Sequence, residues 1–69
     1  MVLRYCLEIR SKKRFNTRDL YDEIKMHNAN LIDLGKHVYV TGVAPYYSFC
    51  AVLEKCLAYG VVECEVGEK

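Results

Sequence analysis

The chain has 69 residues, of which 52% are apolar and 28% are charged. A chain of this size and composition is predicted to form one small globular domain over residues 1–69, and a two-domain enzyme with an interdomain cleft is excluded. Ten Lys and Arg residues nearly balance nine Asp and Glu residues, so the net charge is +1. The whole molecule therefore has no strong field that would attract nucleic acid or an anionic membrane.

The apolar stretches and the cysteines limit the classes of protein further. The stretch 57–62 is far shorter than the roughly 20 residues that cross a bilayer, and the first residues lack the basic and apolar regions of a signal peptide. We therefore expect a cytoplasmic protein with no membrane segment and with reduced thiols. The four cysteines show no C-x-x-C spacing, so we expect neither a metal site nor a cofactor. Cys50, Cys56 and Cys64 are predicted to be small buried apolar side chains.

A strand and a short helix are predicted in the first half of the chain. In residues 3–10 apolar and polar side chains alternate, which is typical of a strand with one buried face. The basic segment 11–15 interrupts this pattern, and Asn16 or Thr17 can then cap a helix that ends near Asn28. The apolar side of that helix is predicted to hold Leu20, Tyr21, Ile24 and either His27 or Asn28.

The second half is predicted to contain two strands, a helix and a final strand. Residues 29–34 and 37–43 are β-rich runs, and Gly35-Lys36 between them is a hairpin signal. Pro45 suits the first turn of a helix, Gly60 suits its end, and the apolar stripe between them consists of Tyr46, Phe49, Cys50, Leu53, Cys56 and Leu57. The last run, 61–66, is predicted to be a strand with Val62, Cys64 and Val66 on one side and Glu63 and Glu65 on the other.

The predicted order of elements is β-α-β-β-α-β, which in a chain this short indicates an α+β protein with the ferredoxin-like split βαβ arrangement. Both helices then cover one face of a four-stranded antiparallel sheet. Its spatial order is fourth, first, third, second strand, because the crossovers are right-handed. A winged helix also combines short helices with a hairpin. It is less favoured, because the first strand alternates regularly and no helix-turn-helix pair is visible.

The charged residues are unevenly distributed along the chain. Residues 1–36 hold eight basic and five acidic side chains, whereas residues 37–69 hold two basic and four acidic ones. The loop after the first strand and the hairpin are predicted to lie at one edge, where cations could bind the phosphates of RNA or DNA. The residues expected to contact an anion or nucleic acid are Lys12, Lys13, Arg14, Arg18, Lys36, His37 and Tyr39. The alternative is a solvated loop whose lysines keep the protein soluble and block edge pairing.

The face of the sheet without helices is predicted to be solvated. Tyr39 is its one clear platform on which a base could stack, whereas RNA-binding domains of this fold use several aromatic residues. Glu63 and Glu65 are expected to be cross-strand partners of Arg4, Arg10 or both.

A protein interface is the function that the sequence favours. No histidine lies in a local motif with a carboxylate or cysteine at a useful spacing, so a catalytic role finds little support. Tyr46 and Tyr47 begin the second helix, and Tyr59 is predicted on its outer side, where tyrosine supplies large contact area at low entropic cost. Leu31 and Ile32, on a predicted edge strand, could pair with a strand of a partner or of a second copy. We expect a non-catalytic regulator, inhibitor or adaptor that binds a protein or itself; RNA or DNA binding is the alternative.

Overall fold

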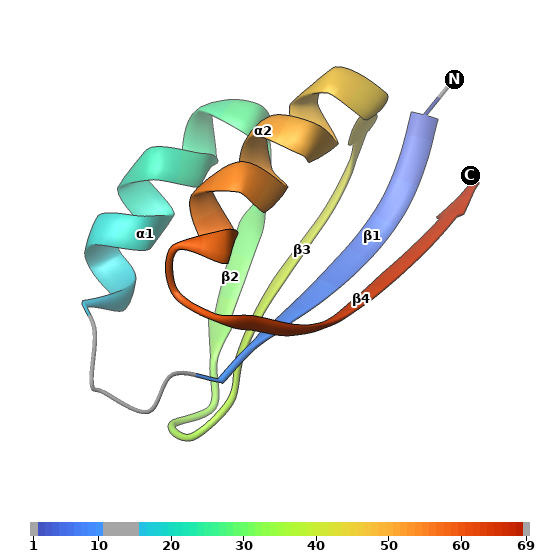
Figure 1. Ribbon diagram of the computed structural model, residues 1–69. Helices are drawn as coiled ribbons and strands as arrows, with labels where there is room; N and C mark the ends of the chain where they lie inside the picture. The colour runs from blue at the N-terminus through green and yellow to red at the C-terminus, as the bar shows by residue number, and fades with distance from the viewer. Residues whose placement is uncertain (1, 11–15, 69) are drawn as a thin grey trace.

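A computed structural model describes residues 2–10 and 16–68 of the chain (Figure 1). Its elements alternate largely as the sequence predicts, with one additional turn of 3-10 helix, η1, after the first helix. In chain order they are β1 (Val2–Ile9), α1 (Thr17–Ile24), η1 (Lys25–His27), β2 (Asn30–Asp33), β3 (Val38–Pro45), α2 (Tyr46–Leu57) and β4 (Val61–Glu68).

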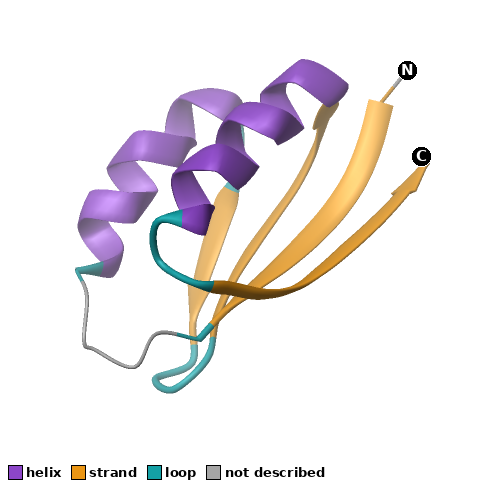
Figure 2. Cartoon of the chain, in the orientation of Figure 1, coloured by secondary structure: helices purple, strands orange, loops and turns teal. Residues whose placement is uncertain are grey.

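The four strands form one antiparallel sheet in the order β2-β3-β1-β4. Read from β4, this is the predicted succession of fourth, first, third and second strand. Both helices lie on the same face of the sheet (Figure 2), with α2 packed against β1 and β3 and α1 packed against β2. Among residues 2–10 and 16–68, no helix lies on the opposite face of the sheet, and we call it the open face.

The ends of α1 and the hairpin are set by short polar contacts. The Arg18 backbone N–H donates to Asn16 Oδ1 (2.9 Å), which confirms Asn16 as the N-cap of α1. At the other end, Asn28 has a left-handed backbone (φ 60°) and closes η1. The hairpin turns at Gly35 with φ 84°, a conformation that glycine adopts without a steric penalty, and the Gly35 N–H donates to Asp33 Oδ1 (2.9 Å).

The core lies between the helices and the inner face of the sheet. The predicted alternation of β1 is confirmed, because Leu3, Tyr5, Leu7 and Ile9 are all buried. Leu20 and Ile24 of α1 belong to the same core. Tyr21 is a correction: its side chain is 42% exposed and does not belong to the core. The buried core consists of Leu3, Tyr5, Leu7, Ile9, Leu20, Ile24, Ala29, Val38, Val40, Ala44, Phe49, Val52 and Cys56.

The predicted apolar stripe of α2 is only partly buried. Phe49, Val52 and Cys56 face the core, so the centre of the buried side lies nearer to Val52 than the sequence suggested. Tyr46 and Leu57, at the two ends of the stripe, are 65% and 60% exposed. The helix thus carries more apolar surface than its own core uses.

Strand β4 differs most from its prediction. A register shift against β1 leaves Val62 as an extra residue, since Val61 pairs with Ile9 and Glu63 pairs with Glu8. Cys64, predicted to be buried, is exposed. It faces the helix layer, but α2 lies over β1 and β3 and does not extend over β4, which is the outermost strand.

No helix in the described parts of the chain is long and apolar enough to span a membrane.

Candidate functional site

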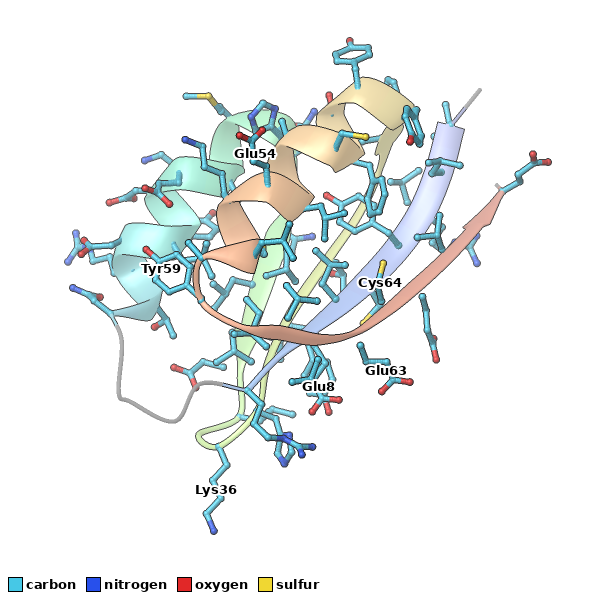
Figure 3. All side chains as sticks on the ribbon, in the orientation of Figure 1. Glu8, Lys36, Glu54, Tyr59, Glu63 and Cys64 are labelled. Carbon is cyan, nitrogen blue, oxygen red and sulfur yellow. The ribbon has the colours of Figure 1, made fainter. Side chains whose placement is uncertain are left out.

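The predicted basic edge is formed by the start of α1 and the hairpin. These segments meet at one end of the molecule, where Thr17 Oγ1 donates a hydrogen bond to Asp33 Oδ2 (3.3 Å). Arg18 is exposed on α1, and Lys36 extends from the hairpin away from the body of the protein (Figure 3). Lys12, Lys13 and Arg14, which carry most of the predicted charge, lie outside the described residues.

His37, a further predicted anion contact, lies beside a carboxylate. Its Nδ1 is 2.7 Å from Glu8 Oε2, and the same oxygen accepts a hydrogen bond from Arg10 Nη2 (3.2 Å). The hydrogen bond to His37 and then the contact with Arg10 lower the pKa of Glu8, while burial of its side chain, only 13% exposed, acts in the opposite direction. Glu8 therefore stays ionised, and a phosphate near His37 would meet this negative charge.

Tyr39 lies on the open face, as predicted, and its surroundings are acidic. It pairs with Glu8 on β1, and its ring stacks near that of His37 at a centroid distance of 6.5 Å. A small pocket of about 110 Å³ beside it is lined by Cys6, Glu8, Tyr39, Glu63 and Glu65. Three carboxylates so close to the ring disfavour the phosphates that accompany a stacked base.

Glu63 and Glu65 of β4 do not form the predicted ion pairs. Glu63 lies opposite Glu8, and Glu65 lies opposite Cys6, so neither is opposite an arginine. Among the described residues, the salt bridges of this face link Glu8 with Arg10 and with His37. The reason is the register of β4, which places Gly67 opposite Arg4. The charges of Glu63 and Glu65 are left to the solvent.

A larger, shallow hollow of about 740 Å³ crosses the open face near the ends of β1 and β4. Its lining is mixed, with one arginine, two carboxylates, amides and a thiol. The thiol is that of Cys6. Burial, followed by the charge of Glu65, raises its pKa, and this makes Cys6 a poor nucleophile. The lining residues are Arg4, Tyr5, Cys6, Asn28, Asn30, Thr41, Gly42, Val43, Glu65, Val66, Gly67 and Glu68. In residues 2–10 and 16–68, no cluster of His, Cys, Asp and Glu side chains is placed to hold a metal ion.

The predicted interface residues occupy different surroundings. Tyr46 and Tyr47 are 65% and 75% exposed on the first turn of α2. Ile32 is exposed on the open face, whereas Leu31 is half-buried against the core. Tyr59 lies beyond the end of α2 and packs against the core, so it is not on the outer side of that helix. Burial, followed by the charges of Glu23 and Asp19 of α1, raises the pKa of Tyr59.

One apolar surface was missed in the sequence. Along one side of α2, apolar residues recur at helical spacing; they are Tyr46, Cys50, Leu53 and Leu57. Tyr59 follows on the other side, close to α1. The four apolar residues therefore face away from α1. This is the side of β4, where Cys64 and Val66 point toward the helix layer and are exposed. We call this set the β4 strip: Tyr46, Cys50, Leu53, Leu57, Cys64 and Val66.

A signal for the β4 strip was present in the sequence. The predicted sheet order already placed the fourth strand at an edge, and the alternation of Cys64 and Val66 with Glu63 and Glu65 was recognised. Alternation tells which side chains share a face, but it does not tell whether a helix covers that face. The sequence therefore predicts a buried Cys64, whereas in the structure Cys64 is exposed.

No protein-family model, no curated protein and no solved structure matches this chain.

Proposed function

We propose that this chain is a protein-binding domain that acts by docking, as a regulator, inhibitor or adaptor, and has no catalytic role. We infer that its fold is the ferredoxin-like split βαβ arrangement, which the element order and the sheet order β2-β3-β1-β4 support.

The observation that carries the proposed function is the exposed apolar side of α2. Tyr46 and Tyr47 stand next to each other on its first turn, and Leu57 is 60% exposed at its other end. The core of the domain is complete without these side chains, because Phe49, Val52 and Cys56 fill the space above the sheet. Tyrosine is among the residue types that are enriched where a protein interface gains most of its binding energy.

RNA or DNA binding has less support as a second candidate. Of the residues predicted for it, Tyr39 and His37 lie beside the ionised Glu8, and Glu63 and Glu65 extend the negative charge across the open face. Of the predicted basic edge, the structure describes Arg18 and Lys36, and Asp33 lies between the segments that carry them. Proteins that hold nucleic acid by its backbone need several unopposed cations along one surface.

The test is affinity capture from the native cell extract with three forms of the protein. We expect the wild type to retain a protein partner, the double variant Tyr46→Ala/Tyr47→Ala to lose it, and the control Tyr21→Ala, which removes an exposed tyrosine from α1, to keep it. Each capture is run with and without nuclease. A partner lost on nuclease treatment would favour nucleic acid, and equal capture by all three forms would exclude docking through α2.

A further inference from the structure

We propose that β4 is the edge to which a partner protein adds an extended strand, and that in this strand Lys or Arg alternates with apolar residues. This inference rests on the proposed function, and it names the chemistry of the partner.

The first observation is the position of β4 in the sheet. It pairs with β1 on one side only, and in the described parts of the chain no strand lies on its other side. Every residue of β4 except Val61 is exposed. A strand of eight residues therefore offers its outer row of backbone N–H and C=O groups to a partner, which is the geometry of strand addition.

The second observation is that the two faces of β4 differ in chemistry. On the open face, Glu63 and Glu65 have no ion-pair partner in the described residues, whereas Glu8 beside them is already paired with Arg10 and His37. On the helix side, Cys64 and Val66 are exposed next to the side of the sheet that α2 covers, and Glu68 follows on the same face at the end of the strand. Figure 3 shows Cys64 on the helix side of β4 and Glu63 on the opposite side.

This difference determines the partner. Successive side chains of an added strand point to opposite faces, so one set would lie beside the glutamates and the other beside the β4 strip. Opposite charges across neighbouring strands stabilise the pairing, and apolar side chains would cover the exposed flank of α2. Alternating basic and apolar residues satisfy both faces at once.

A second copy of this chain fits the same edge poorly. Antiparallel self-pairing of two β4 strands brings residues of the same face opposite one another. In the register centred on Cys64, Glu63 of one copy lies opposite Glu65 of the other, and shifting the centre to Glu65 places the two Glu65 side chains together. Like charges directly opposite are destabilising, so β4 is better suited to a basic strand than to itself.

The other edge of the sheet is a weaker candidate. Strand β2 has four residues, and its Asp33 already accepts hydrogen bonds from Thr17 and Gly35. On the open face, Ile32 pairs with Tyr39, and Asn30 precedes it on that face, so the described open-face residues of β2 offer no carboxylate like Glu63. A long basic strand would find fewer backbone partners there.

The probe for the proposal is a synthetic peptide of about eight residues, the length of β4, in which Lys and Val alternate. Fluorescence anisotropy measures its binding against two control peptides, one with Glu in place of Lys and one with the same Lys and Val residues in two separate blocks. We expect binding of the alternating basic peptide alone. The variant Glu63→Lys/Glu65→Lys should weaken this binding about tenfold or more and should instead bind the Glu/Val peptide.

Backbone pairing is tested with two N-methylated forms of the Lys/Val peptide, methylated at alternate residues in one or the other register. The N–H groups of alternate residues point to the same edge of a strand, so one form should bind and the other should not. Protection of Cys64 from iodoacetamide by the binding form locates the peptide at β4, because this thiol lies at the middle of the strand. Equal binding of both forms would show simple charge attraction and would overturn the proposal.

The outcomes separate this inference from the proposed function. If the natural partner is lost from Tyr46→Ala/Tyr47→Ala but is retained by Glu63→Lys/Glu65→Lys, and the Lys/Val peptide does not bind, the domain docks through α2 and strand addition at β4 is excluded. If both variants lose the same partner and the peptide competes with it, the inference stands. If neither variant loses a partner and the peptide does not bind, both proposals are overturned.

Discussion

The Tyr5 ring lies over Gly42 on the neighbouring strand, and this contact leaves no space for a side chain at residue 42. The two residues pair directly across β1 and β3, and a Cβ atom on residue 42 would be 2.5 Å from Tyr5 Oη and 2.7 Å from Tyr5 Cζ. The ring is only 2% exposed and packs on Phe49 of α2 at a centroid distance of 5.0 Å. It is therefore held from both sides.

We predict that Gly42→Ala destabilises the protein by about 1–3 kcal/mol, because the added methyl group forces the buried Tyr5 ring out of its position. Urea unfolding followed by circular dichroism measures the change. Gly67→Ala on β4 is the matched control, since a Cβ atom at residue 67 meets no atom within 4 Å. If the two alanine variants were equally stable, the close contact between Tyr5 and Gly42 would be ruled out.

We predict that Tyr5→Phe stabilises the protein by about 1 kcal/mol. The Tyr5 hydroxyl is buried and has no hydrogen-bond partner among the described residues, and burial raises its pKa. Removing an unsatisfied polar group restores the free energy that its desolvation costs. The control is Tyr47→Phe, an exposed position where no change is expected.

The Tyr5 hydroxyl oxygen is also the atom nearest to a Cβ atom placed on residue 42. The effects of Tyr5→Phe and Gly42→Ala on stability are therefore coupled. In the double variant Tyr5→Phe/Gly42→Ala, the alanine should cost less than it does alone, and a double-mutant cycle measures this difference. If Gly42→Ala destabilised the protein equally with and without the Tyr5 hydroxyl, the ring would move away from residue 42 at no cost in free energy, and the coupling would be ruled out.

The hydrogen bond between Glu8 and His37 makes the free energy of unfolding depend on pH in the acid range. The hydrogen bond from His37 is the largest cause that lowers the pKa of Glu8 in the folded state, and Arg10 contributes in the same direction. Because the folded pKa lies below the unfolded one, Glu8 contributes stability above its unfolded pKa, roughly 4.3. That contribution is lost as the pH falls through the folded pKa.

We predict that His37→Ala raises the pKa of Glu8 toward its ordinary value, and that Arg10→Ala raises it less. An NMR titration of the Glu8 carboxyl carbon in the three proteins measures the order. In urea unfolding between pH 3 and 7, Glu8→Gln should show a weaker loss of stability on acidification than the wild type. A larger effect of Arg10→Ala than of His37→Ala would contradict the assignment of His37 as the main partner.

The sequence was informative wherever a local pattern determines the structure. The alternation in β1 and the turn at Gly35 depend on neighbours close in the chain, and both predictions are confirmed. The cap is also local, and the structure selects Asn16 from the two predicted positions, Asn16 and Thr17. The contact between Glu8 and His37 depends on the register of two strands whose residues are 29 positions apart, which no local pattern reports. This explains why His37 was assigned to an anion site although it contacts a carboxylate.

Whether an apolar side chain is buried is harder to predict from the sequence than the face of the element on which it lies. Cys56 and Cys64 both lie on the apolar side of their elements, and the sequence treats them alike. They differ because α2 presses Cys56 onto the sheet, while no helix covers β4 above Cys64. Whether an apolar face is covered depends on how far the helix layer extends. In the described residues α1 packs on β2 and α2 packs on β1 and β3, which leaves β4 at the edge uncovered.

The two cysteines make this difference measurable. Burial raises the pKa of Cys56 to about 11, so at pH 8 its thiolate fraction in the folded protein is about one in a thousand, and the sulfur is also shielded from reagents. We predict that iodoacetamide modifies Cys64 in the native protein, while modification of Cys56 follows the global unfolding curve in urea. Pulse labelling with mass spectrometry of each cysteine peptide gives both rates in one sample, so Cys64 serves as the internal control. Labelling of Cys56 as fast as Cys64 without urea would contradict the packing of α2 on the sheet.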